Sequence, residues 1–438
     1  MKAPDVTIVG AGPVGALMAL MLARRGRQVQ LYERRPDPRQ HAAERGRSIN
    51  LALAARGLAA LRHAGVLATI EPELVRMTGR MLHDEQCHTQ LALYGQRDAE
   101  VIWSISRANL NRALLSVAAT LPNIQMQFDT RCTDHDPARG TLHMAHGRCA
   151  ESVSAPLLIA ADGAGSAVRA ALAQRGYCQS RVDELDHDYQ ELEIPARADG
   201  SYALEREALH IWPRGGHMLI ALPNTDGSFT ATLFLPRRGA HSFETLSSDS
   251  FRADFPDAAA LMPDLAEQLR AHPQGQLGTL HCFPWHGGGA LLLGDAAHAI
   301  VPFHGQGLNC GFEDCVVLDS LLARGGADES AVFAAFEHDR RVNTDAIATM
   351  ALENYVEMRD TVLDPMFERR TLLAKELERR FPRRFIPRYS MVMFHPEISY
   401  SDALHRGQMQ ERVLDAMISQ RIAADSAQAA ALLSDAGL

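Results

Sequence analysis

The fold is decided by the stretch Gly10-Ala11-Gly12-Pro13-Val14-Gly15, which stands between a predicted strand at residues 5–9 and a predicted helix over residues 13–25. The first glycine allows a tight turn, the second lets a pyrophosphate approach the backbone, and the third lets helix and strand pack closely. A second strand is predicted over residues 28–33 and ends on Glu33, whose carboxylate can accept hydrogen bonds from a ribose diol. Glycine turns also occur without a ligand, but the strand, helix and acid together predict an α/β dinucleotide-binding unit.

Two further predicted strands end on short acidic turns. Residues 157–161 lead into Asp162-Gly163, and residues 290–293 lead into Gly294-Asp295. Strands that end in this way are typical of a parallel sheet whose carboxyl edge holds a ligand. A nicotinamide dehydrogenase would not need the second of these turns, whereas Asp295 can hydrogen-bond a ribityl hydroxyl. We therefore expect a flavin dinucleotide rather than a nicotinamide one.

The remaining sequence predicts two other kinds of structure. Residues 80–105 and 185–235 contain short strand patterns of an antiparallel sheet, at 209–212, 217–222 and 229–235. Apolar residues at three- and four-residue spacing predict helices over 331–358 and 371–380, and the tail at 424–438 reads as a packing helix. We expect an FAD-binding domain with a parallel sheet (residues 1–75, 101–180 and 275–328), an interleaved substrate-binding sheet domain (76–100 and 181–274) and a C-terminal helical region (329–438).

Composition excludes several classes of protein. The chain has 438 residues with 44 Lys+Arg against 53 Asp+Glu, a net charge of −9, so no basic face for nucleic acid is expected. Seven cysteines without C-x-x-C spacing argue against a disulfide framework and a zinc site, and fit a reducing cytosol. No secretory signal or bilayer-spanning stretch is visible, so we expect a soluble cytoplasmic protein that does not associate with membranes.

The three turns, in this order across residues 8–311, resemble the FAD-dependent aromatic hydroxylases that share the p-hydroxybenzoate hydroxylase fold. Segments 46–53, 104–111, 302–315 and 353–360 resemble the kynurenine-hydroxylating branch of that family, over nearly the whole chain to about residue 412. Eukaryotic members of the branch carry a C-terminal membrane anchor. This chain ends without one, so the resemblance implies a bacterial, soluble form.

The resemblance implies FAD as cofactor and L-kynurenine, NADPH and O2 as substrates. The residues that it assigns to FAD are Gly10, Gly12, Val14, Gly15, Glu33, Arg34, Ala52, Arg107, Asp162, Asp295, Gly307, Leu308 and Asn309. Among them Arg107 matches the arginine near the pyrophosphate. The glycine-rich segment before residue 308 can place backbone N–H groups against the isoalloxazine ring.

The same resemblance implies a substrate site. Arg80 and Tyr94 match residues that hold the substrate's amino-acid carboxylate, and Asn354 and Tyr389 match two further polar contacts. A guanidinium can grip a carboxylate with two hydrogen bonds, and phenol and amide donors can complete the cage. Taken alone, Arg80 is typical of a solvated surface arginine, and the two tyrosines are typical of strand or core aromatics.

Phe303, His304 and Met358 match the lining beside the flavin. We assign His304 to shape or hydrogen bonding and expect no acid–base residue, because the substrate's own aniline nitrogen can supply electron density. His298 lacks a partner at ligand spacing, so no metal is implied, and Cys310 and Cys315 read as packing residues.

The implied reaction begins with reduction of FAD by NADPH. A flavin C4a-hydroperoxide then transfers oxygen to the ring carbon next to the amine, in tryptophan catabolism or pyridine-nucleotide biosynthesis. A hydroxylase of another aromatic acid, or a reductase or regulatory flavoprotein without oxygen transfer, remains an alternative. The sequence leaves open whether the protein is a monomer or a homodimer.

Overall fold

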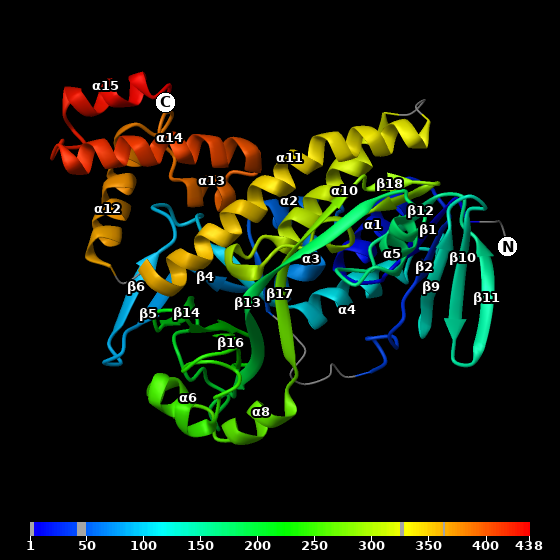
Figure 1. Cartoon of the computed structure of the whole chain (residues 1–438), viewed down its shortest axis with the longest axis horizontal. Helices are drawn as coiled ribbons and strands as arrows, with labels where there is room; N and C mark the ends of the chain where they lie inside the picture. Colours follow the sequence, from blue (N-terminus) through cyan, green and yellow to red (C-terminus); the bar gives the residue numbers. More distant parts are fainter. Residues whose placement is uncertain (1–3, 42–49, 325–327, 362–363) are drawn as a thin grey trace.

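The structure is a computed structural model that describes residues 4–41, 50–324, 328–361 and 364–438 (Figure 1). Residues 46–49 of the quoted segment 46–53 lie outside this part of the chain.

A six-stranded sheet holds the three turns that the sequence singled out. Its strand order is β18-β19-β12-β1-β2-β8, with all neighbours parallel except β18 and β19. The strands are β1 (Val6–Val9), β2 (Val29–Tyr32), β8 (Ile124–Gln127), β12 (Leu158–Ala160), β18 (His286–Gly287) and β19 (Ala290–Leu292). Because β1, β12 and β19 are parallel neighbours, the turns that follow them meet at one edge of the sheet.

Helix α1 (Pro13–Arg24) begins directly after the glycine turn and is almost entirely buried. Its residues belong to the same core as the parallel sheet, together with α10 (Gly307–Ala323) and α4 (Arg107–Ala118). Such an apolar helix buries both of its faces, as expected where helices cover a parallel sheet. The predicted β-α-β unit and parallel sheet are confirmed.

The largest sheet has seven strands in the order β17-β13-β16-β15-β14-β5-β6. These are β5 (Gly79–His83), β6 (Thr89–Leu93), β13 (Gln179–Ile194), β14 (Ala208–Pro213), β15 (Met218–Pro223), β16 (Phe229–Pro236) and β17 (Gln274–Phe283). The expected antiparallel sheet is therefore confirmed with one correction. β14 and β5 pair in parallel, because β5 arrives from a distant part of the chain rather than through a hairpin.

Strands β13 and β17 connect the two large sheets. They pair over most of their length and run from the parallel sheet into the seven-stranded one (Figure 1). The helices α6 (Ser248–Asp254), α7 (Pro256–Ala259) and α8 (Leu265–Ala271) belong to the segment between β16 and β17. Their apolar residues share a core with β13, β15 and β16.

Two small sheets complete the β structure. One joins β3 (Asn50–Leu53), β7 (Ile102–Ser106) and β4 (Val75–Met77), and the other is a meander of β9 (Thr130–Asp136), β10 (Thr141–His146) and β11 (Cys149–Ser154). The remaining short helices before α10 are α2 (Ala55–His63), α3 (Leu67–Ile70), η1 (Glu71–Glu73), α5 (Ala167–Gln174), α9 (Asp295–His298) and η2 (Pro302–His304).

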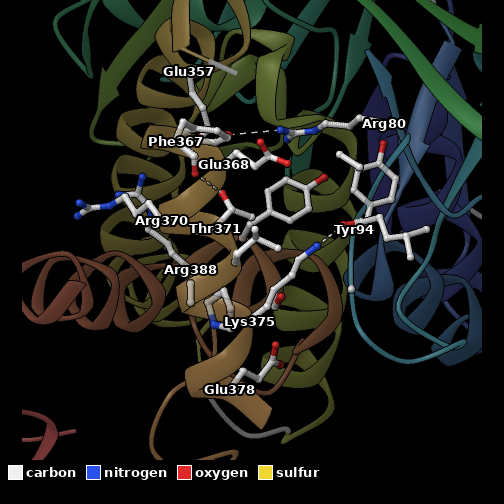
Figure 2. Close-up of a pocket in the computed structure, with 18 of the residues that line it drawn as sticks. Arg80, Tyr94, Glu357, Phe367, Glu368, Arg370, Thr371, Lys375, Glu378 and Arg388 are labelled. Carbon is white, nitrogen blue, oxygen red and sulfur yellow. Dashed lines mark hydrogen bonds and ion pairs between the residues drawn. The ribbon is translucent and has the colours of Figure 1, made fainter. Parts of the chain in front are cut away.

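The C-terminal part is helical, as the sequence predicted. Its elements are α11 (Glu329–Val356), the π-helical turn η3 (Glu357–Thr361), α12 (Pro365–Arg380), α13 (Arg388–Phe394), α14 (Tyr400–Ser419) and α15 (Ala427–Asp435). Helix α12 faces strands β5 and β6 across a cavity (Figures 1 and 2). Within the described residues, no helix combines the length and the apolar character needed to cross a membrane.

Candidate active site

The turn before α1 leaves room for a ligand at only one of its three glycines. A Cβ atom at Gly15 would lie 1.9 Å from the carbonyl oxygen of Gly10, and one at Gly10 would lie 2.4 Å from that of Ala161. At Gly12, which has φ −65°, a Cβ atom would meet nothing within 4 Å. Two glycines therefore let the backbone close up, and Gly12 leaves open space at the N-terminus of α1, where a phosphate is favoured.

Glu33 lies at the end of β2, beside the same turn. Its Oε2 accepts a hydrogen bond from the backbone of Ala11 at 2.9 Å, and its Oε1 accepts one from Arg35 at 3.0 Å. A carboxylate has about four acceptor positions, so a ribose diol can still be bound. The following Arg34 is exposed.

Asp162 has one carboxylate oxygen committed and one free. Oδ2 accepts from the backbone N–H of Ala167 at 2.8 Å, at the start of α5. Oδ1 is buried and lacks a hydrogen-bond partner among the described residues, and burial raises the pKa of this carboxyl group. A buried acceptor without a hydrogen bond destabilises the protein, so a ligand that donates a hydrogen bond to Oδ1 would be favoured.

Asp295 is exposed at the N-terminus of α9 and lines a cavity of about 320 Å³. Arg107 and Ala52 lie in the wall of the same cavity. The side chain of Val14 also packs against the backbone of two glycines: a Cβ atom built on Gly294 would lie 3.2 Å from it, and one built on Gly311 would lie 2.8 Å from it.

The side chain of Asn309 is completely buried and makes its hydrogen bonds to backbone groups of the protein. It donates to the carbonyl oxygens of Ala52 and Gly305, both at 2.8 Å, and accepts from the backbone N–H groups of Ala54 and Gly57 at 2.9 and 3.2 Å. This arrangement fixes the start of α10 relative to β3 and α2. Only the backbone groups of the first turn of α10, which begins at Gly307 and includes Leu308, are left to face a ligand.

Arg80 on β5 is a largely buried cation at the predicted substrate site. Its side chain is 11% exposed, and Nη1 lies 3.3 Å from Oε1 of Glu357 on η3 (Figure 2). The guanidinium carbon is 4.8 Å from the ring centroid of Tyr389, a cation–π contact. Its Nε is buried and makes no hydrogen bond within the described part of the chain.

Three rings are stacked beside Arg80. The centroid of Tyr389 lies 5.8 Å from that of Tyr94 and 5.4 Å from that of His304, with interplanar angles of 13° and 18°. The Tyr94 hydroxyl and the His304 Nδ1 are buried, and neither has a hydrogen-bond partner in the described ranges. Burial, together with the positive charges of Arg80 and Arg388, lowers the pKa of His304 to about 3, so its imidazole is neutral near pH 7.

Asn354 and Phe303 form the wall next to these rings. Nδ2 of Asn354 donates to the carbonyl oxygen of Phe303 at 2.6 Å and lies 3.1 Å from Sδ of Met358. The ring of Phe303 stacks on Tyr355 with centroids 3.8 Å apart. Asn354 therefore holds the segment that carries Phe303 and His304, in addition to lining a cavity.

The predicted substrate residues lie around two cavities. A cavity of about 470 Å³ is lined by Arg80, Tyr94, His304, Asn354 and Tyr389, and the 320 Å³ cavity by Arg80, Phe303, His304, Met358 and Tyr389. The structure thus brings together all seven side chains, and three of them border both cavities.

Sequence reasoning missed several charged residues of the larger of these two cavities, among them Glu357 and Lys375. Glu357 lies three residues after Asn354 within the quoted segment 353–360, a spacing that puts both on one helical face, so it could have been found. Lys375 on α12 donates to the carbonyl oxygen of Leu93 at 2.7 Å, across the cavity (Figure 2). No local pattern connects these two segments.

The residues present fit FAD. The open space at Gly12, the free acceptor of Asp162 and the exposed Asp295 and Arg107 at the 320 Å³ cavity offer places for the pyrophosphate, hydroxyl groups and ring of a flavin dinucleotide.

Comparisons with known proteins agree with this geometry. The family model for an FAD binding domain matches residues 3–351. Two kynurenine 3-monooxygenases, from Stenotrophomonas maltophilia and Xanthomonas campestris pv. campestris, are 47% and 49% identical to this chain. The alignments cover 98% and 94% of it, and 95% and 91% of the relatives.

Solved structures share the fold at lower identity. A 2-methyl-3-hydroxypyridine-5-carboxylic acid oxygenase gives a TM-score of 0.68 at 20% identity, covering 83% of this chain and 95% of its own. The p-nitrophenol 4-monooxygenase of Pseudomonas putida gives 0.67 at 17% identity, covering 95% and 98%.

The fold and the site define an FAD-dependent monooxygenase of the aromatic hydroxylase class. Within that class, the identity over nearly the whole chain shows that it belongs to the kynurenine 3-monooxygenase family.

Proposed function

We propose that this protein hydroxylates L-kynurenine at ring carbon 3, with FAD as bound cofactor, NADPH as electron donor and O2 as oxidant. The observation that carries the proposal is the group of buried polar atoms without partners, within the described residues, around the two cavities. Arg80 Nε, the Tyr94 hydroxyl and His304 Nδ1 all need a ligand to complete their hydrogen bonding. An amino-acid carboxylate satisfies a guanidinium and a phenol at once.

The chain's own task is to position the substrate. Arg80 would hold the carboxylate at the cavity wall, with Tyr94, Tyr389 and Asn354 as further contacts. Phe303, His304 and Met358 would line the place of the aromatic ring. Fixing a reactant in this way replaces a bimolecular encounter with an oriented one, which lowers the entropic part of the barrier.

When bound, FAD supplies electron transfer from NADPH and the activation of O2 for transfer to the ring. We propose that Gly10, Gly12 and Gly15 shape its pyrophosphate site, with Arg107 nearby, and that Glu33 and Asp295 accept from its hydroxyl groups. The other cofactor contacts that we propose are Val14, Arg34, Ala52, Asp162, Gly307, Leu308 and Asn309.

No protein acid or base is required in this scheme. The neutral state of His304, which follows from its pKa of about 3, supports a role as a hydrogen-bonding or shape-determining ring rather than a proton donor. The aniline nitrogen of kynurenine activates the ring carbon next to it. Exclusion of water from the site matters more than acid–base catalysis by the protein, and the buried stack of Phe303 on Tyr355 helps to exclude water.

We also propose that the FAD-binding part comprises residues 1–75, 101–180 and 275–328, and the substrate-binding sheet part 76–100 and 181–274, with the helical part at 329–438. The membership of β5, β6, β14, β15 and β16 in one seven-stranded sheet supports the grouping of residues 76–100 with 181–274, while β17 of the same sheet falls mostly in the proposed FAD-binding part. A cytoplasmic location is proposed because seven free cysteines suit a reducing compartment.

The test is NADPH oxidation by the purified FAD-bound protein, with and without L-kynurenine, with product analysis for 3-hydroxykynurenine. Stimulated oxidation together with stoichiometric product is the expected result. Stimulation by a different aromatic acid alone would identify another hydroxylase. NADPH oxidation without any hydroxylated product from a panel of aromatic acids would identify a flavoprotein that does not transfer oxygen.

A further inference from the structure

Three metal-binding side chains meet at a place away from both cavities of the site. His217 lies in the connection between β14 and β15, His241 lies in the segment after β16, and Asp254 is the last residue of α6. Their ligand atoms all lie within 4.8 Å of one another. The three segments are brought together by the fold of the seven-stranded sheet and not by any local sequence pattern.

The spacing of the donor atoms is that of a tetrahedral site. His217 Nε2 and His241 Nδ1 lie 3.2 and 3.1 Å from the same atom, Oδ2 of Asp254. Zinc bonds of about 2.0–2.1 Å place neighbouring ligands of a tetrahedron roughly 3.3–3.4 Å apart. Two of the three distances between the donor atoms are therefore already close to those of a tetrahedral zinc site.

His217 provides the second, independent observation. Its side chain is 5% exposed, and its Nε2 makes no hydrogen bond within the described ranges, despite the nearby carboxylate. His241 is 59% exposed, which leaves room for water as a further ligand.

The other cluster of metal-binding side chains in the described residues is less suited to bind a metal ion. His298, Cys310 and Asp314 are also close together, but Nε of Arg340 donates to Asp314 at 2.6 Å, so a positive charge already pairs with that carboxylate. Near the first cluster, Arg214 directs its guanidinium to backbone oxygens, including that of Asp254 at 2.6 Å, and leaves the carboxylate to the two histidines.

We propose that His217, His241 and Asp254 bind one Zn²⁺ ion, with water as the fourth ligand. Imidazole and carboxylate donors suit Zn²⁺ and not Mg²⁺ or Ca²⁺, which prefer oxygen ligands. The ion ties the β14–β15 connection, the segment after β16 and the end of α6 to each other. Since Met218 and Ile220 on β15 line the 320 Å³ cavity, the ion stabilises the sheet that supports the substrate site.

The test uses the FAD-bound protein after treatment with a chelator. We expect it to take up one equivalent of Zn²⁺ per chain, measured by calorimetry and by metal analysis after gel filtration. We also expect Zn²⁺, but not Mg²⁺, to raise the melting temperature by a few degrees. His241→Ala should lower the affinity by at least about 10- to 100-fold, because even the loss of a partner outside the ligand shell has this effect.

Two control variants separate the proposal from simpler explanations. Asp254→Asn keeps the shape of the third ligand and should also lose Zn²⁺. His88→Ala removes an exposed histidine 3.1 Å from Asp84, a pair without a second histidine, and should bind Zn²⁺ like the wild type. Equal Zn²⁺ binding by the wild type and His241→Ala would assign the metal to other groups, such as the exposed thiols of Cys87 and Cys149, and would overturn the proposal. Failure of the wild type to bind Zn²⁺ would also overturn the proposal.

Discussion

Replacing Arg80 with methionine should abolish tight binding of L-kynurenine and leave FAD in place. The side chain is 11% exposed, so its charge is weakly screened by solvent, and it lies on β5 away from the glycine turn of the cofactor site. Methionine has a similar length and fills the space of the aliphatic part, so the change removes mainly the charge and the hydrogen-bond donors.

The magnitude follows from the groups that remain. Removing one partner of a buried, hydrogen-bonded charge pair costs about 2–5 kcal/mol, which corresponds to roughly 30- to 4,000-fold in the dissociation constant. Glu357, now 3.3 Å from Arg80, would stay behind and face the substrate carboxylate without a cation between them. Because two like charges then repel each other in a partly buried site, we expect the upper half of this range.

Two further variants make the reasoning specific. Arg80→Lys keeps the charge but not the planar pair of donors, so its loss should be intermediate. In the double variant Arg80→Met/Glu357→Gln the repulsion is gone, and binding should partly recover relative to Arg80→Met alone.

The assay is a titration of L-kynurenine against NADPH oxidation, with the FAD content of each variant as the control for folding. Wild-type half-saturation in Arg80→Met would show that the carboxylate is bound elsewhere. A double variant that binds no better than Arg80→Met would show that Glu357 does not face the substrate.

Three other predictions concern the cofactor and stability. Gly12→Val should keep the melting temperature of the FAD-free protein, because a side chain there meets only open space, but it should lose FAD because the side chain fills the place of the pyrophosphate. Gly15→Ala should instead lower the melting temperature itself. Retention of one FAD per chain by Gly12→Val would refute the assignment. Asp295→Ala should release FAD more readily during dialysis with an unchanged melting temperature, and unchanged FAD affinity would exclude this side chain from the site. Burial and the neighbouring His83 lower the pKa of His210 from 6.5 to about 4. The folded state therefore binds fewer protons than the unfolded state, and the free energy of unfolding should fall between pH 6.5 and pH 4. The decrease should be up to about 1.4 kcal/mol per pH unit, or about 3 kcal/mol in all. Urea unfolding at pH 7 and pH 5 should therefore show a smaller decrease for His210→Gln than for the wild type, and equal decreases would exclude this histidine as the cause.

The parts of the fold that the sequence predicted are those with a local signal. The glycine turn at 10–15 predicted β1 and α1 within one or two residues, because the roles of its glycines depend only on their neighbours in the chain. The parallel pairing of β14 with β5 joins residues about 130 positions apart, and no turn chemistry encodes it.

The same distinction holds for the site. Asp162 was expected at the ligand edge, but its second role at the start of α5 depends on how the loop at 162–167 closes. The pairing of Arg80 with Glu357 spans 277 residues, so neither residue by itself predicts the other. The donors of the proposed zinc site come from three segments with no common spacing, and motif reasoning therefore predicted no metal.

The order of strands in the six-stranded sheet has a consequence for synthesis of the chain. β1 is made first, yet its neighbour β12 ends at residue 160 and the next strand, β19, ends at residue 292. At about 5–20 residues per second, a ribosome needs roughly 15–60 s to complete this stretch. β1 can pair with β2 early and with β12 once residue 160 is made, but the edge of β12 lacks its partner β19 until the end of that time, and the three cofactor turns cannot meet before then. Capture of FAD is therefore a late event in biogenesis, and a chain truncated before β19 should be a substrate for chaperones rather than a small flavoprotein.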